Sequence, residues 1–195
     1  LIGARQSEVI FTSGGTESVN FALAGVLRGV TTPPHARRRS GIVTTAGEHH
    51  AVLETAEALS GPGHALTIVG VDSFATVDVD ALEAAVGDGT ALVSVMHANN
   101  ETGAIQPVRE AANIARAQGA LFHTDAVQTV GKERVNVQTL GVDLLSLSAD
   151  GTATSGSLYL QNQFGDAVAV RVYGATARFS LWRRRQTDGV WRRRW

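Results

Sequence analysis

The chain has 195 residues, a formal net charge of −1, 44% hydrophobic residues and 18% charged residues. These values are typical of a globular domain with its own core, and the charge balance gives no indication of a nucleic-acid partner. No apolar run reaches the roughly 20 residues that cross a bilayer, so we expect no membrane partner and a cytoplasmic location. The sequence lacks cysteine, which excludes disulfides, thiolate metal sites and cysteine nucleophiles within it. Because it begins at Leu1, we expect a missing N-terminus.

Short apolar runs alternate with stretches of helical periodicity along most of the chain. The predicted elements, in chain order, are a strand at 9–11, a helix at 19–27, an exposed loop at 31–40, a strand at 41–45, a helix at 49–60, a strand at 65–71, a helix at 79–86, a strand at 91–96, a helix at 108–118, and strands at 120–123, 143–147 and 167–173. This alternation predicts an α/β fold with a mostly parallel sheet and helices on both faces.

Polar residues cluster where the predicted strands end. The clusters are residues 12–17, 48–50, 97–101 and 124–125, together with Ser146 and Ser148. Ligands of parallel α/β sheets bind at the carboxyl ends of the strands, so we expect these five segments to converge on one rim.

Two of these clusters have the chemistry of an anion site and a ring contact. Ser-Gly-Gly-Thr-Glu-Ser at 13–18 places glycines at a strand-to-helix turn, where free N–H groups and the helix dipole suit a phosphate. A plain helix cap with a glycine turn is the alternative. The imidazole of His49, at the end of a strand, could stack on an aromatic ring or transfer protons, or could be structural.

The other two clusters carry amides and a carboxylate. Residues 99–103 read Asn-Asn-Glu-Thr-Gly; an amide there could bind a ligand hydroxyl, and an Asx-turn would account for one asparagine. Asp125 at a buried strand end needs a cationic partner, such as a protonated pyridine nitrogen, unless it caps a helix. Gln128 follows closely enough to reach the same ligand.

Four motifs in order carry a resemblance to a known family. They are Phe-Thr-Ser-Gly-Gly-Thr-Glu-Ser at 11–18, Glu-His-His-Ala-Val at 48–52, Met-His-Ala-Asn-Asn-Glu-Thr-Gly at 96–103, and His-Thr-Asp-Ala-Val-Gln at 123–128. Over about residues 8–160 the chain resembles the cysteine desulfurases and selenocysteine lyases, enzymes of the class V aminotransferase fold that depend on pyridoxal 5′-phosphate (PLP). The resemblance implies a truncated large domain of the PLP fold-type I.

The resemblance also implies a role for each matching residue. Gly15, Thr16 and Ser148 would hold the PLP phosphate. His49 would stack on the ring and assist proton transfers, and Asn100 would contact the substrate or a cofactor oxygen. Asp125 would pair with the pyridine nitrogen, and Gln128 would bond the phenolic oxygen. The family further implies an amino-acid substrate, a homodimer and a sulfur-acceptor protein, with sulfur removed from L-cysteine to give L-alanine.

The chain lacks the two residues that form covalent bonds with cofactor or sulfur in the family. In the family a His-Lys pair follows the strand that matches 143–148, and its lysine forms the Schiff base with PLP. Here Asp150 and Gly151 occupy those positions, and Lys132 is the only lysine in the sequence. The sulfur-accepting cysteine is also absent. We therefore expect a catalytically inactive chain that binds PLP non-covalently.

The C-terminal part differs in character from the rest. We predict an incomplete PLP-binding domain at 1–160 and a divergent or non-native tail at 161–195, arising from frame errors or pseudogene decay from about Asp150 onward. Trp-Arg repeats near 182–185 and 191–195 leave a basic-tailed nucleic-acid or membrane binder as a lesser alternative. A non-catalytic module that keeps the PLP pocket or a dimer surface is the other alternative.

Overall fold

The computed structural model describes residues 2–31, 39–148, 156–157, 160–161, 167–173, 178–184 and 191–193. Most of the loop expected at 31–40, and the segment in which the family carries its His-Lys pair, lie outside the described residues. The helices are α1 (Gly15–Thr31), α2 (His50–Leu59), α3 (Val79–Ala85), α4 (Val108–Ala117) and α5 (Val137–Leu140), preceded by a 3-10 turn at Gln6–Glu8. The strands are β1 (Phe11–Thr12), β2 (Gly41–Thr45), β3 (Leu66–Val69), β4 (Thr90–Ser94), β5 (Leu121–Asp125), β6 (Leu144–Ser148), β7 (Gly156–Ser157), β8 (Leu160–Gln161), β9 (Ala167–Tyr173), β10 (Arg178–Arg184) and β11 (Trp191–Arg193).

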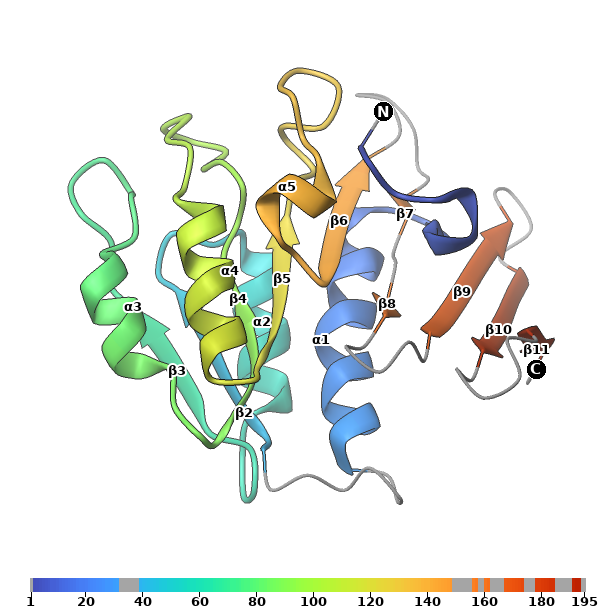
Figure 1. Ribbon diagram of the computed structural model, residues 1–195, viewed down its shortest axis with the longest axis horizontal. Coiled ribbons are helices and arrows are strands. Elements are labelled where there is room, and N and C mark those ends of the chain that lie inside the picture. Colours follow the sequence, from blue (N-terminus) through green and yellow to red (C-terminus); the bar gives the residue numbers. More distant parts are fainter. Residues whose placement is uncertain are drawn as a thin grey trace.

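The main sheet is mostly parallel, as the sequence predicts. Its strand order is β1-β7-β6-β5-β4-β2-β3. The neighbours from β6 to β3 pair in parallel, whereas β7 runs antiparallel to both β6 and β1. The chain leaves β2 toward β3 at one edge, then returns past β2 and builds outward through β4, β5 and β6 (Figure 1). The order of the strands therefore reverses between β2 and β4.

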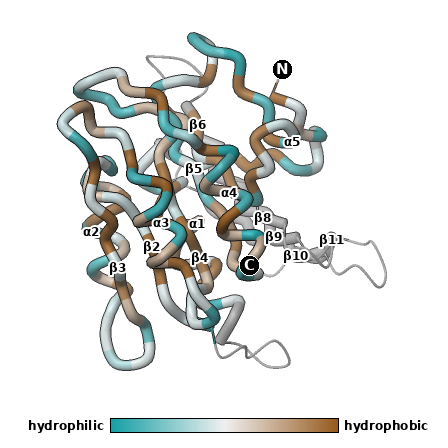
Figure 2. The backbone as a smooth tube through the Cα atoms, turned by 60° about the vertical axis from the view of Figure 1, so that its left-hand side comes forward, coloured by the Kyte–Doolittle hydropathy of each residue, from teal (hydrophilic) through white to brown (hydrophobic). Residues whose placement is uncertain are grey.

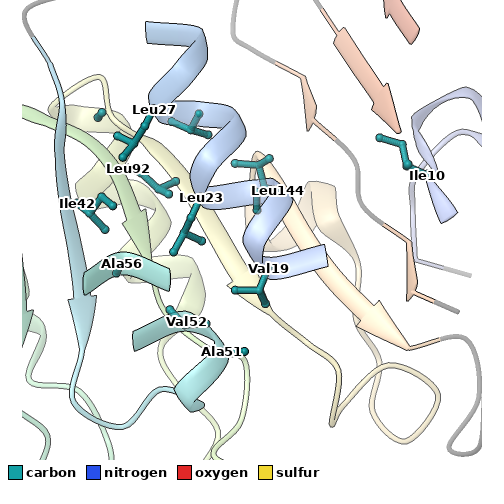
Figure 3. Close-up of a cluster of buried hydrophobic side chains, with 13 residues drawn as sticks. Ile10, Val19, Leu23, Leu27, Ile42, Ala51, Val52, Ala56, Leu92 and Leu144 are labelled. Atoms are coloured by element: carbon teal, nitrogen blue, oxygen red, sulfur yellow. The ribbon is translucent and has the colours of Figure 1, made fainter. Parts of the chain in front are cut away.

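Helices cover both faces of this sheet, because successive side chains along each strand enter two different hydrophobic layers. Ile42 and Leu92 pack with α1 and α2, whereas the next residues, Val43 and Val93, pack with α3 and α4. Figure 3 shows the first layer, in which Leu23 and Leu27 of α1 face the sheet. A fully buried leucine contributes about 1.5–3 kcal/mol, so these two layers hold the helices in place.

Helix starts follow local capping chemistry. The Asp78 carboxylate accepts hydrogen bonds from two N–H groups of α3, and Asn136 does the same for α5. The N-cap of α2 is His49, whose ring Nδ1 accepts the N–H of Ala51. A histidine that caps a helix has a fixed ring, which is relevant to the candidate site.

The predicted elements agree with the observed ones to within a few residues, with some exceptions. The first strand is 11–12 rather than 9–11, and α1 begins four residues before the predicted helix, because its glycine-containing first turn carries no apolar periodicity. The four-residue helix α5 is too short to show periodicity and was not predicted. The strand predicted at 167–173 is confirmed as β9.

A second sheet is formed by the C-terminal strands, in the order β11-β10-β9-β8, and each neighbouring pair is antiparallel (Figure 1). The strands β10 and β11 were not predicted, because the Trp-Arg repeats lack the alternation that indicates a strand, and β8 has only two residues. The proposed division between residues 1–160 and 161–195 stays a prediction.

Hydrophobic residues concentrate in the strands and in α1, with hydrophilic stretches among the loops (Figure 2). Within the described ranges, no helix combines the length and apolar character needed to cross a membrane.

Candidate functional site

One cavity, with a volume of about 180 Å³, lies at the carboxyl ends of the parallel strands. It is lined by the start of α1, the start of α2, the loop after β4 and the turn after β5. The lining residues are Gly15, Thr16, His49, Ala51, Met96, Ala98, Asn100, Asp125, Val127 and Gln128. Six of the seven residues singled out from the sequence are among them. Ser148 lies at the end of β6, and its side chain lies outside the described part of the chain.

The start of α1 presents free backbone donors to this cavity. The first hydrogen bond of the helix runs from the N–H of Ser18 to the carbonyl of Gly14, 3.0 Å, so the N–H groups of Gly15 and Thr16 precede the helical ladder. A Cβ on Gly15 would lie 2.9 Å from Cγ2 of Val127, which is too close for any side chain. Glycine therefore lets the helix start approach the turn after β5.

His49 also lines the cavity, and its ring has a fixed tautomer. Its Nδ1 accepts the N–H of Ala51 at 3.1 Å, so Nδ1 carries a lone pair and the ring proton of the neutral imidazole lies on Nε2. The ring of His50 lies 4.6 Å away, centroid to centroid, and His50 is exposed. The imidazole that lines the cavity is therefore oriented by its hydrogen bond at the start of α2.

The two adjacent asparagines have different surroundings. The side chain of Asn99 is buried: its Oδ1 accepts the N–H groups of Glu101 and Thr102, and its Nδ2 donates to the carbonyl of Gly47 at 2.9 Å. Asn99 therefore forms the Asx-turn and joins the β4 loop to the β2 loop. Asn100 is exposed and lines the cavity. The residues alone left open which asparagine forms the turn; the hydrogen bonds assign it to Asn99, and Asn100, which the resemblance singles out, stays at the cavity.

Asp125 is the carboxylate of the cavity. It is 9% exposed at the end of β5, and its Oδ1 accepts the N–H of Val127 at 3.0 Å. Burial raises the pKa of Asp125, while the Val127 hydrogen bond and the nearby His49 act in the opposite direction. The residues after Asp125 form a turn closed by the N–H of Val130 on the carbonyl of Ala126, and this turn places Gln128 at the cavity.

A second carboxyl lies beside the cavity and was not predicted as a site residue. Burial raises the pKa of Glu48 to about 8, and the neighbouring charge of Asp125 adds to the rise. Its Oε1 accepts the N–H of Met96 at 2.6 Å, while its Oε2 is buried without a partner among the described residues. The sequence signal was present, since a glutamate at the end of a buried strand precedes His49.

Ser146 belongs to a buried network rather than to the expected rim. Its hydroxyl lies 2.9 Å from Oγ of Ser18 and 3.0 Å from Nε2 of His123, whose Nδ1 lies 2.8 Å from Oγ of Ser94. Burial lowers the pKa of His123 to about 3, so its imidazole is neutral. These polar side chains connect β4, β5, β6 and α1 beneath the cavity.

The sequence model of the family described as "Aminotransferase class-V" matches residues 1–182 of this chain. The chain belongs to the aminotransferase class-V family. Among curated relatives of this class-V chain, the cysteine desulfurase IscS of Dictyoglomus turgidum is 48% identical over 163 residues, which are 82% of this chain and 40% of that protein. The cysteine desulfurase IscS of Methanosarcina thermophila is 44% identical over 165 residues, 82% of this chain and 39% of that protein.

Solved structures agree with the class-V assignment. A NifS-like protein has a TM-score of 0.75 at 39% identity, over 84% of this chain and 45% of its own. SspA in complex with cysteine has a TM-score of 0.74 at 31% identity, over 82% of this chain and 45% of its own. The mostly parallel sheet with helices on both faces matches the fold of these PLP enzymes. The chain spans about two fifths of the length of the curated relatives it matches.

Proposed function

We propose that this class-V chain is the part of a cysteine desulfurase-type protein that binds PLP, and that it holds the cofactor without a covalent bond. The observation that supports this proposal is the convergence of Gly15, Thr16, His49, Asn100, Asp125 and Gln128 on one cavity. These six residues come from four motifs that are far apart in the sequence. Their meeting at the carboxyl end of the sheet is what a cofactor site requires.

The residues present fit the cofactor. The free N–H groups at the start of α1 suit a phosphate, and the cradle stays open because Gly15 has no Cβ beside Val127. No lysine or arginine lies among the described residues that line the cavity beside the buried Asp125. A protonated pyridine nitrogen would supply a cationic partner for Asp125, and such a partner stabilises a buried carboxylate.

Each side chain then has a defined task. Thr16 and the helix start bind the phosphate, and Gln128 donates from its amide to the phenolic oxygen. His49 presents its ring with the proton on Nε2, because Nδ1 is held by Ala51. Asn100 contacts the substrate or the same oxygen. PLP, when bound to such a site, supplies an electron sink for the bonds at the carbon next to an amino group. We propose Ser148 as a further phosphate ligand.

The proposed absence of a covalent bond rests on the lysine. Lys132, the one lysine in the sequence, is exposed on the turn after β5, and it is not among the described residues that line the cavity. Arginine cannot replace it as a nucleophile, because it stays protonated. We therefore propose that the chain as it stands does not turn over. For the whole protein of this type we propose L-cysteine as substrate, L-alanine as product, a sulfur-acceptor protein as partner and a homodimeric state.

A second candidate is a non-catalytic module that keeps the PLP pocket or a dimer surface. The combination of the cavity with Asp150 and Gly151 at the positions of the family's His-Lys pair favours it. Both candidates predict non-covalent PLP binding; they differ in whether a longer form of the protein regains turnover.

The test is a PLP titration followed by absorbance, then borohydride reduction, intact mass and peptide mapping. We expect saturable binding that is at least tenfold weaker in Asp125→Asn, because the pyridine nitrogen loses its charged partner. Asp88→Asn is the matched control, since Asp88 is exposed and precedes β4 at the other end of the sheet. We expect no reduced PLP on Lys132.

Three results would contradict the proposal. Equal affinity of wild type and Asp125→Asn, or no saturable binding, would remove the cavity as the site. A mass gain that maps to Lys132 and disappears in Lys132→Arg would show covalent attachment, and would overturn the non-covalent part.

A further inference from the structure

Glu48 lies where the strand order of the sheet reverses. It follows β2, and its Oε1 accepts the N–H of Met96, which follows β4. In the same place the side-chain amide of Asn99 donates to the carbonyl of Gly47. Two adjacent strand ends that would otherwise diverge are therefore joined by side chains. Met96 and His49, the residues on either side of this link, both line the cavity.

The hydrogen bonds of Glu48 determine where a proton can lie. Oε1 accepts two donors, the N–H of Met96 at 2.6 Å and the hydroxyl of Thr45 at 3.3 Å. It therefore has no lone pair to spare for a proton. Oε2 is enclosed without a partner among the described residues. An ionised carboxylate would leave this buried oxygen charged and unpaired, which is far costlier than an unpaired neutral hydroxyl.

The surroundings of Glu48 also disfavour a negative charge. The charged neighbour that acts on it is Asp125 at the end of β5, and the groups that reach it from β2 and β4 are the neutral hydroxyl and amide described above. Asp125 is the better placed of the two to be ionised, because it faces the cavity and accepts the N–H of Val127. Two carboxyls in one buried site separate into an ionised and a neutral form.

We propose that Glu48 is a positioning residue that works as a neutral carboxylic acid: with its proton on Oε2 it joins the ends of β2 and β4, and it leaves the negative charge of the cavity to Asp125. The link through Glu48 fixes the positions of Met96 and His49, which line the cavity. The expected effect of Glu48 on PLP binding rests on the proposed function. The effect of Glu48 on stability can be measured without the cofactor.

The decisive experiment compares wild type with Glu48→Gln, which is neutral and keeps the acceptor for Met96. Urea unfolding of the 195-residue chain is followed from pH 4.5 to 9. A buried acid whose pKa rises from 4.5 to about 8 binds its proton in the folded state over that interval, while the unfolded chain releases it. Folding of wild type therefore weakens relative to the variant as pH rises, by up to tenfold in the folding equilibrium constant per pH unit. The difference levels off above pH 8.

The matched variants are Glu48→Ala, which removes the link, and Glu54→Gln, which neutralises an exposed glutamate on α2. We expect Glu48→Ala to lose stability at pH 5, where Glu48→Gln stays near wild type. We expect Glu54→Gln to follow the pH profile of wild type. In PLP titrations at pH 7, Glu48→Gln retains affinity within about threefold, whereas Glu48→Ala loses tenfold or more.

Parallel pH profiles of wild type and Glu48→Gln would overturn the proposal, and so would equal destabilisation by glutamine and alanine at pH 5. If none of the proteins binds PLP, the proposed function fails, while the pH-dependent difference between wild type and Glu48→Gln still decides the protonation of Glu48.

Discussion

Replacing Gly15 by alanine tests how tightly the start of α1 approaches the turn after β5. The added Cβ would lie 2.9 Å from Cγ2 of Val127 and 3.6 Å from its Cγ1. Carbon atoms prefer a separation of about 3.5–4.0 Å, so the helix start must move by more than half an ångström. Overpacking of this kind costs about 1–3 kcal/mol. Because both residues line the cavity, we expect the same shift to weaken PLP binding by tenfold or more.

The assay is a double-mutant cycle with urea unfolding and PLP titration as readouts. Val127→Ala removes the methyl groups that cause the clash, so Gly15→Ala in that background should recover at least about 1 kcal/mol of the loss. Gly14→Ala is the matched control, since a Cβ there meets no atom within 4 Å and Gly14 does not have a positive φ. Gly14 is the N-cap of α1, where glycine is preferred over alanine, so we expect a cost of about 0.5–1 kcal/mol that Val127→Ala does not relieve. Additive effects of Gly15→Ala and Val127→Ala would refute the proposed contact.

Two further predictions concern the buried polar groups. His123→Gln should destabilise the chain at pH 7 by about 1–3 kcal/mol, because the hydroxyls of Ser94 and Ser146 lose a partner. Burial lowers the pKa of His123 from 6.5 to about 3, so wild-type stability falls as pH drops through this interval, by up to about 1.4 kcal/mol per unit. In urea unfolding at pH 7, 6, 5 and 4, the stability difference between wild type and His123→Gln should therefore narrow and then reverse. A constant difference would contradict a neutral, buried imidazole. Asn99→Ala should cost about 2 kcal/mol because it removes the Asx-turn and the bond to Gly47, whereas Asn100→Ala should stay within about 0.5 kcal/mol of wild type in thermal unfolding but weaken PLP binding about tenfold. Equal loss of stability in the two variants would contradict the division between a structural and a ligand-facing asparagine.

The amino-acid sequence by itself determined the layers of this fold and the place of the site. Strands with a buried residue at every position, such as 90–94, require cover on both faces, and the intervening helical periodicity supplies it. Polar clusters after successive strands then had to meet at one edge, because parallel strands end on the same side of a sheet. The Asp-Ala-Val-Gln run at 125–128 could be placed at the cavity on this ground alone.

Only the tertiary structure decided which polar residues face the cavity and which are buried beneath it. Asn99 and Asn100 are alike in sequence, and only hydrogen bonds to the β2 loop distinguish them. Ser146 was expected on the rim, yet it lies in the network of His123. The neutral state of Glu48 depends on Met96 and Asp125, which are distant in sequence. Burial and the charge of neighbours set the protonation of a side chain, and both arise only when separate strands are brought together.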